Sequence, residues 1–310
     1  MAGYGKVGMA AMLPILSYMG IPAFNLPTAL VSNTLDYGDF TQLDTTDYMR
    51  QTLPIWKKLG FRFDAICTGL MFSEEQARLV AQFCREQAEA GGTIFVDPVM
   101  GDGGRLYNGI GQEQVRLMRE MVGVAHLIFP NYTEACYLAA VPYQHDGMTR
   151  REACALLDRL TAPTASPAPA ESPAPGSCGR AFPARNPAPA ESPAPAESPA
   201  SGSCGRVFPA RNPARSALIT SCFIDGRHQV CGYDAATGKY FFHDYDEIPG
   251  IFHGTGDIFS AVLIGHLMKR ESLSASTRQA MDVVREMIYR NRDVTDRNCG
   301  IFIERCLDLL

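Results

Sequence analysis

The sequence predicts an α/β protein whose central sheet is mostly parallel and carries helices on both faces. Short, continuous apolar segments alternate with longer amphipathic segments along the chain, as repeated βα units require. The apolar segments contain few polar residues, which is typical of strands that are buried on both faces of a sheet. Hydrophobic residues make up 46% of the 310 residues, so the chain can bury a large core.

The predicted elements follow one another in a regular order. Strands are expected at residues 63–68, 93–96, 126–129 and 217–220, and helices at 73–90, 112–122, from Thr133, from Thr149 and at 258–268. Two helices begin with a capping box, formed by Ser73 with Gln76 and by Thr149 with Glu152. Residues 3–8 read G-x-G-x-x-G, but no strand precedes them in this chain, so we expect them to open the first helix rather than bind a dinucleotide.

Residues 161–215 interrupt this pattern. They hold 13 of the 21 prolines and are otherwise mainly Ala, Ser, Gly and Arg. Residues 169–188 recur at 195–214 with 18 of 20 positions identical, which points to a tandem duplication. Because proline removes backbone donors and this composition offers no core, we expect a disordered surface insertion, with a docking arm as the alternative. Residues 1–160 and 216–310 then form a single domain.

Composition argues against several classes of function. The net charge of −5 argues against nucleic acid as a partner, because proteins that bind polyanions usually carry a basic excess. No apolar run approaches the roughly 18 to 20 residues that span a bilayer, and no signal peptide is recognisable, so we expect a cytoplasmic protein without membrane contact. The ten cysteines include no C-x-x-C pair, which favours reduced core thiols over disulfides or a zinc site.

Four polar segments mark the candidate site. In open parallel sheets, ligands bind beyond the carboxyl ends of the strands, so polar residues placed there are the ones to inspect. The four segments carry Asp97 with Asp102, Asn131 with Glu134, Thr220 with Ser221, and the turn Gly254, Thr255, Gly256 and Asp257.

The turn at residues 254–257 is the most informative of the four. Its two glycines let consecutive N–H groups point into a site at a helix N-terminus, where the partial positive charge favours an anion such as a transferring phosphoryl group. Asp257 is then placed to accept a proton from an attacking hydroxyl. The structural alternative is that Asp257 only stabilises the helix dipole. The chain has no G-x-x-x-x-G-K-[ST] segment, so a P-loop kinase is not predicted.

The other carboxylates suggest a cation. Asp97, Asp102 and Glu134 suit a hard, hydrated ion such as Mg²⁺ that bridges nucleotide phosphates. Each candidate residue also has a structural interpretation, as a turn former, a charge at a helix N-terminus, a helix cap or the end of a strand. We interpret His253, which precedes the turn, as structural rather than catalytic.

Together these segments resemble the ribokinase-like superfamily, and within it the vitamin B6 kinases, which phosphorylate pyridoxal, pyridoxine and pyridoxamine. The resemblance covers residues 1–160 and 216–310. Its most specific segments are DPVMGDGGRLY at 97–107, PNYTE at 130–134 and GTGD at 254–257. It implies a three-layer ribokinase-like fold, ATP-dependent phosphorylation of a 5′-hydroxymethyl group on a small heteroaromatic alcohol, Mg²⁺ as cofactor, a homodimer, and the K⁺ requirement that is common in the family.

The resemblance also implies a role for each candidate residue. Asp257 would be the general base, and Gly254, Thr255 and Gly256 would form the anion hole for the γ-phosphoryl group. Asn131 and Glu134 match the family's N-x-x-E element, which organises Mg²⁺ and water. Asp97 and Asp102 would lie beside the phosphates, Thr220 and Ser221 would contact the ATP phosphates, and Tyr107 would line the site.

Two departures from the family pattern leave alternatives open. Thr34-Leu35-Asp36 stands where the family often has His-Thr-Gly, so the preferred vitamer stays open, and a hydroxymethylpyrimidine kinase would share the same chemistry. Family members also begin with a strand that runs into the Gly-Tyr-Gly turn, and Met1 stands where that strand should have finished, so the first strand is expected to be missing. A truncated, non-catalytic relative is the contrasting alternative, although the intact Asp257 favours an enzyme.

Overall fold

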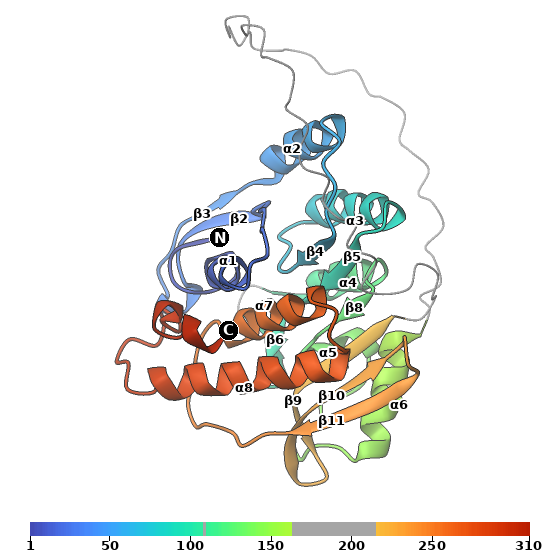
Figure 1. The fold of residues 1–310 in the computed structure, drawn as a ribbon, viewed down its shortest axis with the longest axis vertical. Coiled ribbons are helices and arrows are strands. Elements are labelled where there is room, and N and C mark those ends of the chain that lie inside the picture. The colour runs from blue at the N-terminus through green and yellow to red at the C-terminus, as the bar shows by residue number, and fades with distance from the viewer. Residues whose placement is uncertain (108–109, 163–214) are drawn as a thin grey trace, which may run out of the picture. The chain divides into compact units, whose positions relative to one another are not determined.

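The computed structural model describes residues 1–107, 110–162 and 215–310 (Figure 1). Most of the predicted insertion lies outside these residues, and only its two ends are described. Thr161 is the last residue of α6 (Arg150–Thr161), and Arg215 is buried just before the next strand. The Arg215 guanidinium donates to the carbonyl of Val122, the last residue of α4 (Gln112–Val122), where a cation is favoured by the helix dipole. The division of the chain at residues 160 and 216 stays a prediction.

A six-stranded sheet forms the centre of the fold. Its order is β11-β10-β9-β8-β5-β4. The strands are β4 (Ala65–Thr68), β5 (Thr93–Val96), β8 (Leu127–Ile128), β9 (Ser216–Ile224), β10 (Arg227–Asp234) and β11 (Lys239–Asp244). The first four run parallel to one another, whereas β10 and β11 continue the sheet as an antiparallel meander. The sheet is therefore mostly parallel, as predicted.

Helices cover both faces of this sheet (Figure 1). In β5, Ile94 and Val96 point into one core, whereas Phe95 between them points into the other. The first core is completed by α3 (Glu74–Glu89), α4, α5 (Tyr132–Ala139) and α6, and the second by α1 (Met9–Tyr18), α7 (Thr255–Met268) and α8 (Leu273–Asn291). Burial on both sides explains why this strand is continuously apolar. The prediction of a three-layer α/β fold is confirmed.

A smaller sheet and several short elements complete the fold. The small sheet consists of β1 (Ala2–Tyr4), β2 (Ala29–Asn33) and β3 (Gln42–Asp44), and β6 (Gly101–Asp102) forms a hairpin with β7 (Arg105–Leu106). The remaining elements are α2 (Thr46–Lys58) and the 3-10 helices η1 (Leu35–Tyr37), η2 (Ile303–Arg305) and η3 (Leu307–Leu309). Within the described residues, β1 pairs in parallel with β2 and not with the six-stranded sheet. The prediction about the first strand is not tested by this pairing.

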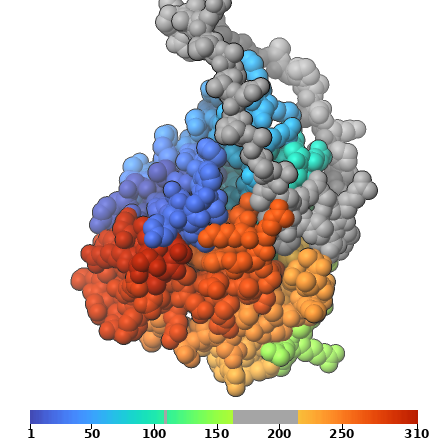
Figure 2. All heavy atoms as spheres, in the orientation of Figure 1, coloured from blue at the N-terminus to red at the C-terminus, as the bar shows by residue number. Residues whose placement is uncertain are grey.

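Residues from the two ends of the sequence lie side by side. The Lys6 N–H donates to the Cys299 carbonyl at 2.7 Å, and the Lys6 ammonium pairs with Glu304 of η2. Figure 2 shows the corresponding blue and red surfaces adjoining. The described cysteines are free thiols, and no helix in the described ranges combines the length and the apolar character that crossing a bilayer requires.

Candidate active site

The turn before α7 has the geometry that its glycines suggest. Gly254 has a φ of 84°, and a Cβ added to it would lie 2.2 Å from the Lys6 carbonyl oxygen, so only glycine fits there. The Thr255 hydroxyl donates to the Phe252 carbonyl at 3.1 Å and closes the turn. Among the described residues, no side chain caps this helix, and the position of Gly256 is open. The first N–H groups of α7 are therefore free to bind an anion.

Asp257 lies where this helix meets the N-terminus of a second one. Its carboxylate accepts a hydrogen bond from the backbone N–H of Gly8, the residue before α1. The side chain keeps a partial opening to solvent, yet protein surrounds most of it. This desolvation raises the pKa of Asp257 from 3.8 to about 6, while the Gly8 N–H acts in the opposite direction. A carboxylate with this pKa is ionised at neutral pH and is more basic than an ordinary aspartate.

Asp97 approaches the same place from the sheet. It directly follows β5, and its N–H donates to the carbonyl of Thr68 at the end of β4, at 2.9 Å. Desolvation and the negative charge of Asp257 raise the pKa of Asp97 to about 7, although the Ser260 hydroxyl, 3.2 Å from its carboxylate, lowers it. Because Asp257 ionises first, its negative charge disfavours the ionised form of Asp97 and so raises the pKa of Asp97. The structure thus brings together two of the predicted residues, Asp97 and Asp257.

Asn131 and Glu134 join the start of α5 to the loop that follows β5. They form a capping box in which each side chain accepts a hydrogen bond from the other residue's N–H at 2.9 Å. The second carboxylate oxygen of Glu134 accepts from the Met100 N–H at 2.9 Å, and the Asn131 amide donates to the Gly101 carbonyl at 2.8 Å. Burial and the charge of Asp97 raise the pKa of Glu134, against these N–H contacts. The pair therefore shapes the loop that carries Asp97.

The three carboxylates that the sequence suggested as Mg²⁺ ligands do not form one metal site. Among the described residues, no group of three or more His, Cys, Asp and Glu side chains is arranged to hold a metal ion. The reason is that both Glu134 oxygens accept backbone N–H groups, and Asp102 is exposed and accepts from the N–H of Gly103 at 2.8 Å. The repulsion between Asp97 and Asp257 still fits a cation that arrives with nucleotide phosphates and keeps most of its water ligands.

Thr220 and Ser221 do not end a strand, which corrects the sequence-based expectation. β9 continues to Ile224, whereas its parallel neighbour β8 ends earlier, at Ile128 opposite Ala217. The Thr220 N–H donates to the Pro130 carbonyl at 3.0 Å, and Thr220 forms an isolated bridge with Asn131. Ser221 has a φ of 56°, which is unusual for a non-glycine residue, and its side chain is exposed. This local distortion places Thr220 beside the Asn131 element and turns Ser221 outward.

Tyr107 lies among the acidic residues of the site. Its N–H donates to the Met100 carbonyl at 3.0 Å, and its side chain is 48% exposed. Desolvation raises the pKa of Tyr107, and the charges of all four acidic site residues act in the same direction, those residues being Glu134, Asp102, Asp97 and Asp257. Acidic residues from three of the predicted segments therefore raise the pKa of this tyrosine together.

Two residues near the site, Gly8 and Ser260, were not predicted from the sequence to take part in it. Gly8 donates to Asp257, and Ser260 contacts Asp97. Ser260 lies three residues after Asp257, a spacing that places both on one face of a helix, and this signal could have identified it. The Nδ1 of His253 lies 3.3 Å from a carboxylate oxygen of Asp36 in η1, and the interpretation of His253 as structural stays a prediction.

The sequence comparisons indicate a kinase family. Residues 4–164 match the family model described as phosphomethylpyrimidine kinase. A curated pyridoxal kinase from Paraburkholderia xenovorans is 32% identical over 139 residues, which cover 42% of this chain and 47% of that relative. The chain thus spans about half the length of the first curated relatives that it matches.

Solved structures extend the similarity over the whole chain. A Bacteroides thetaiotaomicron protein, provisionally named a phosphomethylpyrimidine kinase and crystallised with pyridoxal, is 30% identical, with a TM-score of 0.77 over 100% of this chain and 92% of that one. A pyridoxal kinase from Lactobacillus plantarum is 22% identical and has a TM-score of 0.75 over 99% of this chain and 92% of its own, which supports the fold alone. This protein therefore belongs to the phosphomethylpyrimidine kinase family and has the ribokinase-like fold.

Proposed function

We propose that the protein transfers the γ-phosphoryl group of ATP to the 5′-hydroxymethyl group of a vitamin B6 vitamer, namely pyridoxal, pyridoxamine or pyridoxine. One observation carries this proposal: the carboxylate of Asp257, partly open to solvent and with a pKa raised to about 6 by desolvation, stands at the uncapped N-terminus of α7. Phosphoryl transfer to an alcohol needs both of these parts, a base for the hydroxyl proton and N–H donors for the transferred group. The relative that was crystallised with pyridoxal supports the choice of substrate.

The proposed reaction follows from the positions of these groups. The γ-phosphoryl group binds the N–H groups of Gly254, Thr255 and Gly256, whose partial positive charge stabilises the charge on its oxygens. The substrate oxygen forms a bond to phosphorus, the bond from phosphorus to the β-bridging oxygen breaks, and ADP leaves. Asp257 takes the hydroxyl proton, and the Gly8 N–H keeps its carboxylate oriented.

The remaining site residues would serve the nucleotide. Mg²⁺ would arrive with ATP and neutralise charge on the phosphates. Asp97 and Asp102 would hold it through water ligands, while Asn131 and Glu134 fix the loop between them. Thr220 and Ser221 would contact the phosphates, and Tyr107 would line the substrate side.

Hydroxymethylpyrimidine kinase is the second candidate. The description of the matching family model and the provisional name of the Bacteroides relative both say phosphomethylpyrimidine kinase, which supports a pyrimidine as the acceptor. The curated pyridoxal kinases and the crystal form with pyridoxal favour the first candidate. Both substrates present a hydroxymethyl group on a flat heteroaromatic ring, so the same turn and base would serve either one.

The proposal includes a homodimer. Large exposed apolar side chains are concentrated in the first 72 residues among those described, over the small sheet and α2. Leu30 of β2 and Leu43 of β3 face each other in register and are 41% and 61% exposed. Exposed apolar side chains that are concentrated in one part of the chain are typical of an interface, and a second copy of this chain would cover them.

An ATP-consumption assay tests the proposed function. The purified protein is incubated with Mg·ATP, with and without K⁺, and with each of pyridoxal, pyridoxamine, pyridoxine and hydroxymethylpyrimidine. We expect turnover on at least one vitamer and a decrease in turnover of roughly 10² to 10⁴ in a folded Asp257→Asn variant. Turnover on hydroxymethylpyrimidine alone would replace the first candidate by the second, and a folded Asp257→Asn variant that keeps more than about a tenth of the wild-type turnover would reject the mechanism.

A further inference from the structure

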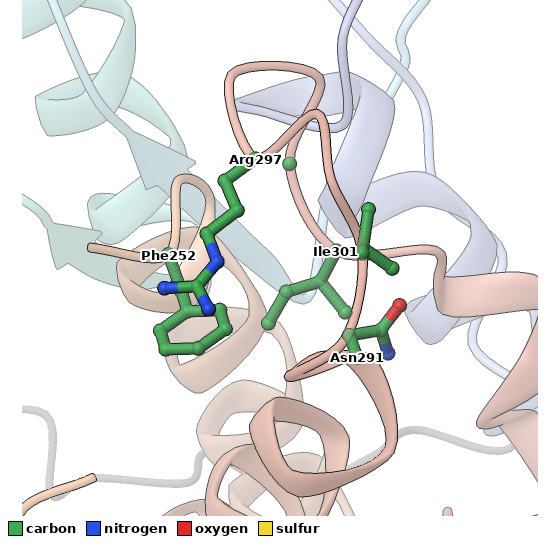
Figure 3. Close-up of a pocket in the computed structure, with 6 residues that line it drawn as sticks. Phe252, Asn291, Arg297 and Ile301 are labelled. Atoms are coloured by element: carbon green, nitrogen blue, oxygen red, sulfur yellow. The ribbon is translucent and has the colours of Figure 1, made fainter. Parts of the chain in front are cut away.

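The loop at residues 249–253 leads into the anion-binding turn, and the side chain of Arg297 packs against this loop. The Arg297 guanidinium lies over the ring of Phe252, with its central carbon 4.6 Å from the ring centroid (Figure 3). Arg297 belongs to the segment that follows α8, 40 residues after Asp257, the last residue of the turn. A guanidinium stacked on an aromatic face is attracted by the ring and, being planar, also fixes the orientation of that ring.

Further contacts fix the guanidinium itself. Its Nη2 donates to the carbonyl of Arg292, the C-cap of α8, at 2.9 Å. A Cβ added to Gly250 would lie 2.4 Å from Nη1, so the loop backbone passes directly against the cation. Ile301 and Asn291 line the same small pocket (Figure 3). Arg297 thus donates a hydrogen bond to the C-terminal end of α8 and also packs against the loop at residues 249–253.

The path from this contact to the turn is short. The carbonyl of Phe252 is the acceptor for the Thr255 hydroxyl, the hydrogen bond that closes the turn. The segment that carries Arg297 also reaches the turn through Lys6. A Cβ added to Gly300 would lie 2.8 Å from the Lys6 carbonyl oxygen, and Gly254 of the turn lies against this same oxygen. The position of Phe252 therefore bears on the position of the N–H groups of Thr255 and Gly256.

We propose that Arg297 is a positioning residue for the anion-binding turn, acting through the ring and the carbonyl of Phe252. The inference rests on the proposed role of the turn in holding the γ-phosphoryl group. Arg297 touches neither nucleotide nor substrate in this assignment. Its contribution is to keep the donors of the turn in place before the phosphoryl group arrives, which spares the cost of ordering them on binding.

Measured affinities for two nucleotides can distinguish a positioning role of Arg297 from a general effect on the stability of the protein. The affinities for ADP and for a non-hydrolysable ATP analogue, each with Mg²⁺, are measured by calorimetry for the wild-type protein and for Arg297→Gln. Only the analogue carries the γ-phosphoryl group. We expect Arg297→Gln to weaken binding of the analogue by about fivefold and of ADP by less than about twofold, the size of effect that a partly buried cation–π contact supports.

Arg305 provides the matched control. Its guanidinium lies over the ring of Phe302, 4.9 Å from the centroid, in a contact of the same kind that does not involve the loop before the turn. Arg305→Gln should leave unchanged the ratio of the affinity for the ATP analogue to the affinity for ADP. Phe252→Tyr should also preserve the ratio, whereas Phe252→Leu should lower it as Arg297→Gln does, and this second variant decides the matter if Arg297→Gln does not fold.

Two results would overturn the proposal. One is an equal loss of affinity for ADP and the analogue, and the other is an unchanged ratio in both Arg297→Gln and Phe252→Leu. Failure of the proposed function is recognised separately, because the wild-type protein would then turn over no vitamer or pyrimidine. The affinity ratio needs no acceptor substrate, so it remains a test of Arg297 in that case as well.

Discussion

The Asp257→Asn variant is expected to lose turnover while gaining stability. Asparagine has nearly the same shape as aspartate, and its carbonyl oxygen can still accept the hydrogen bond from Gly8. It cannot take up the hydroxyl proton, so kcat should fall by roughly 10² to 10⁴, the range that general-base catalysis supplies. For the same reason, kcat/KM of the wild-type protein should rise with pH through about 6, the pKa of the Asp257 carboxyl.

The gain in stability follows from the direction of the pKa shift. A carboxyl whose pKa is raised from 3.8 to about 6 in the folded state binds protons more tightly there than in the unfolded chain. Its burial therefore lowers the stability of the folded state as the pH rises from about 4 to about 6, and the loss then stays constant. At about 1.4 kcal/mol for each pH unit, the full effect is up to about 3 kcal/mol, and the Asn variant escapes it.

The two expectations are checked on the same protein samples. Turnover on the best vitamer is measured at pH 8, and the free energy of unfolding is measured in urea at pH 8 and pH 5. The stability advantage of the variant should be largest at pH 8 and smaller at pH 5. The reasoning is refuted if the folded variant keeps more than about a tenth of the wild-type kcat, or if it is less stable at pH 8, as the loss of a helix-capping charge would make it.

Three further predictions follow from the structure. Gly254→Ala would place a Cβ 2.2 Å from the Lys6 carbonyl, so we expect lost turnover and a decrease of at least about 1 to 2 kcal/mol in unfolding free energy, whereas Gly256→Ala, in open space, should keep its stability within about 1 kcal/mol in the same urea titration. Glu134→Gln leaves one of two buried N–H groups without a matching acceptor, which should cost about 1 to 3 kcal/mol and raise the KM for ATP; unchanged values would contradict the organising role of this side chain. Replacing residues 163–214 by a short Gly/Ser linker should leave turnover and melting temperature nearly unchanged, because loop length costs little, and a loss of activity would show that the segment contributes to the site.

The sequence predicted strands that are buried on both faces, such as β5, and missed strands that are only partly buried, such as β11. The strand at 93–96 and the helix at 112–122 have the predicted limits, because apolar residues at those positions meet a core directly. β10 and β11 were not predicted, since each mixes polar and apolar residues and is held by antiparallel pairing with its neighbour.

The candidate site shows the same division. The convergence of Asp97 and Asp257 could be anticipated, because residues that follow parallel strands or begin the next helix meet at one edge of a sheet. The use of both Glu134 oxygens by backbone N–H groups could not, since it depends on the path of the loop at Met100. The contact of Arg297 with Phe252 joins two loops whose sequences carry no periodic pattern that would pair them.

The packing of Lys6 against both Gly254 and Gly300 has a consequence for when the site forms during synthesis. The ion pair from Lys6 to Glu304 closes a separation of 298 residues along the chain, and the turn rests on the same N-terminal loop. Contacts between such distant positions form late in folding, because the entropy of closing so long a stretch of chain must be lost before the contacts can offset it. The N-terminal segment is synthesised first, so its contacts with Gly300 and Glu304 can form only after those residues have left the ribosome. A nascent chain would therefore hold its sheet before it could hold a nucleotide.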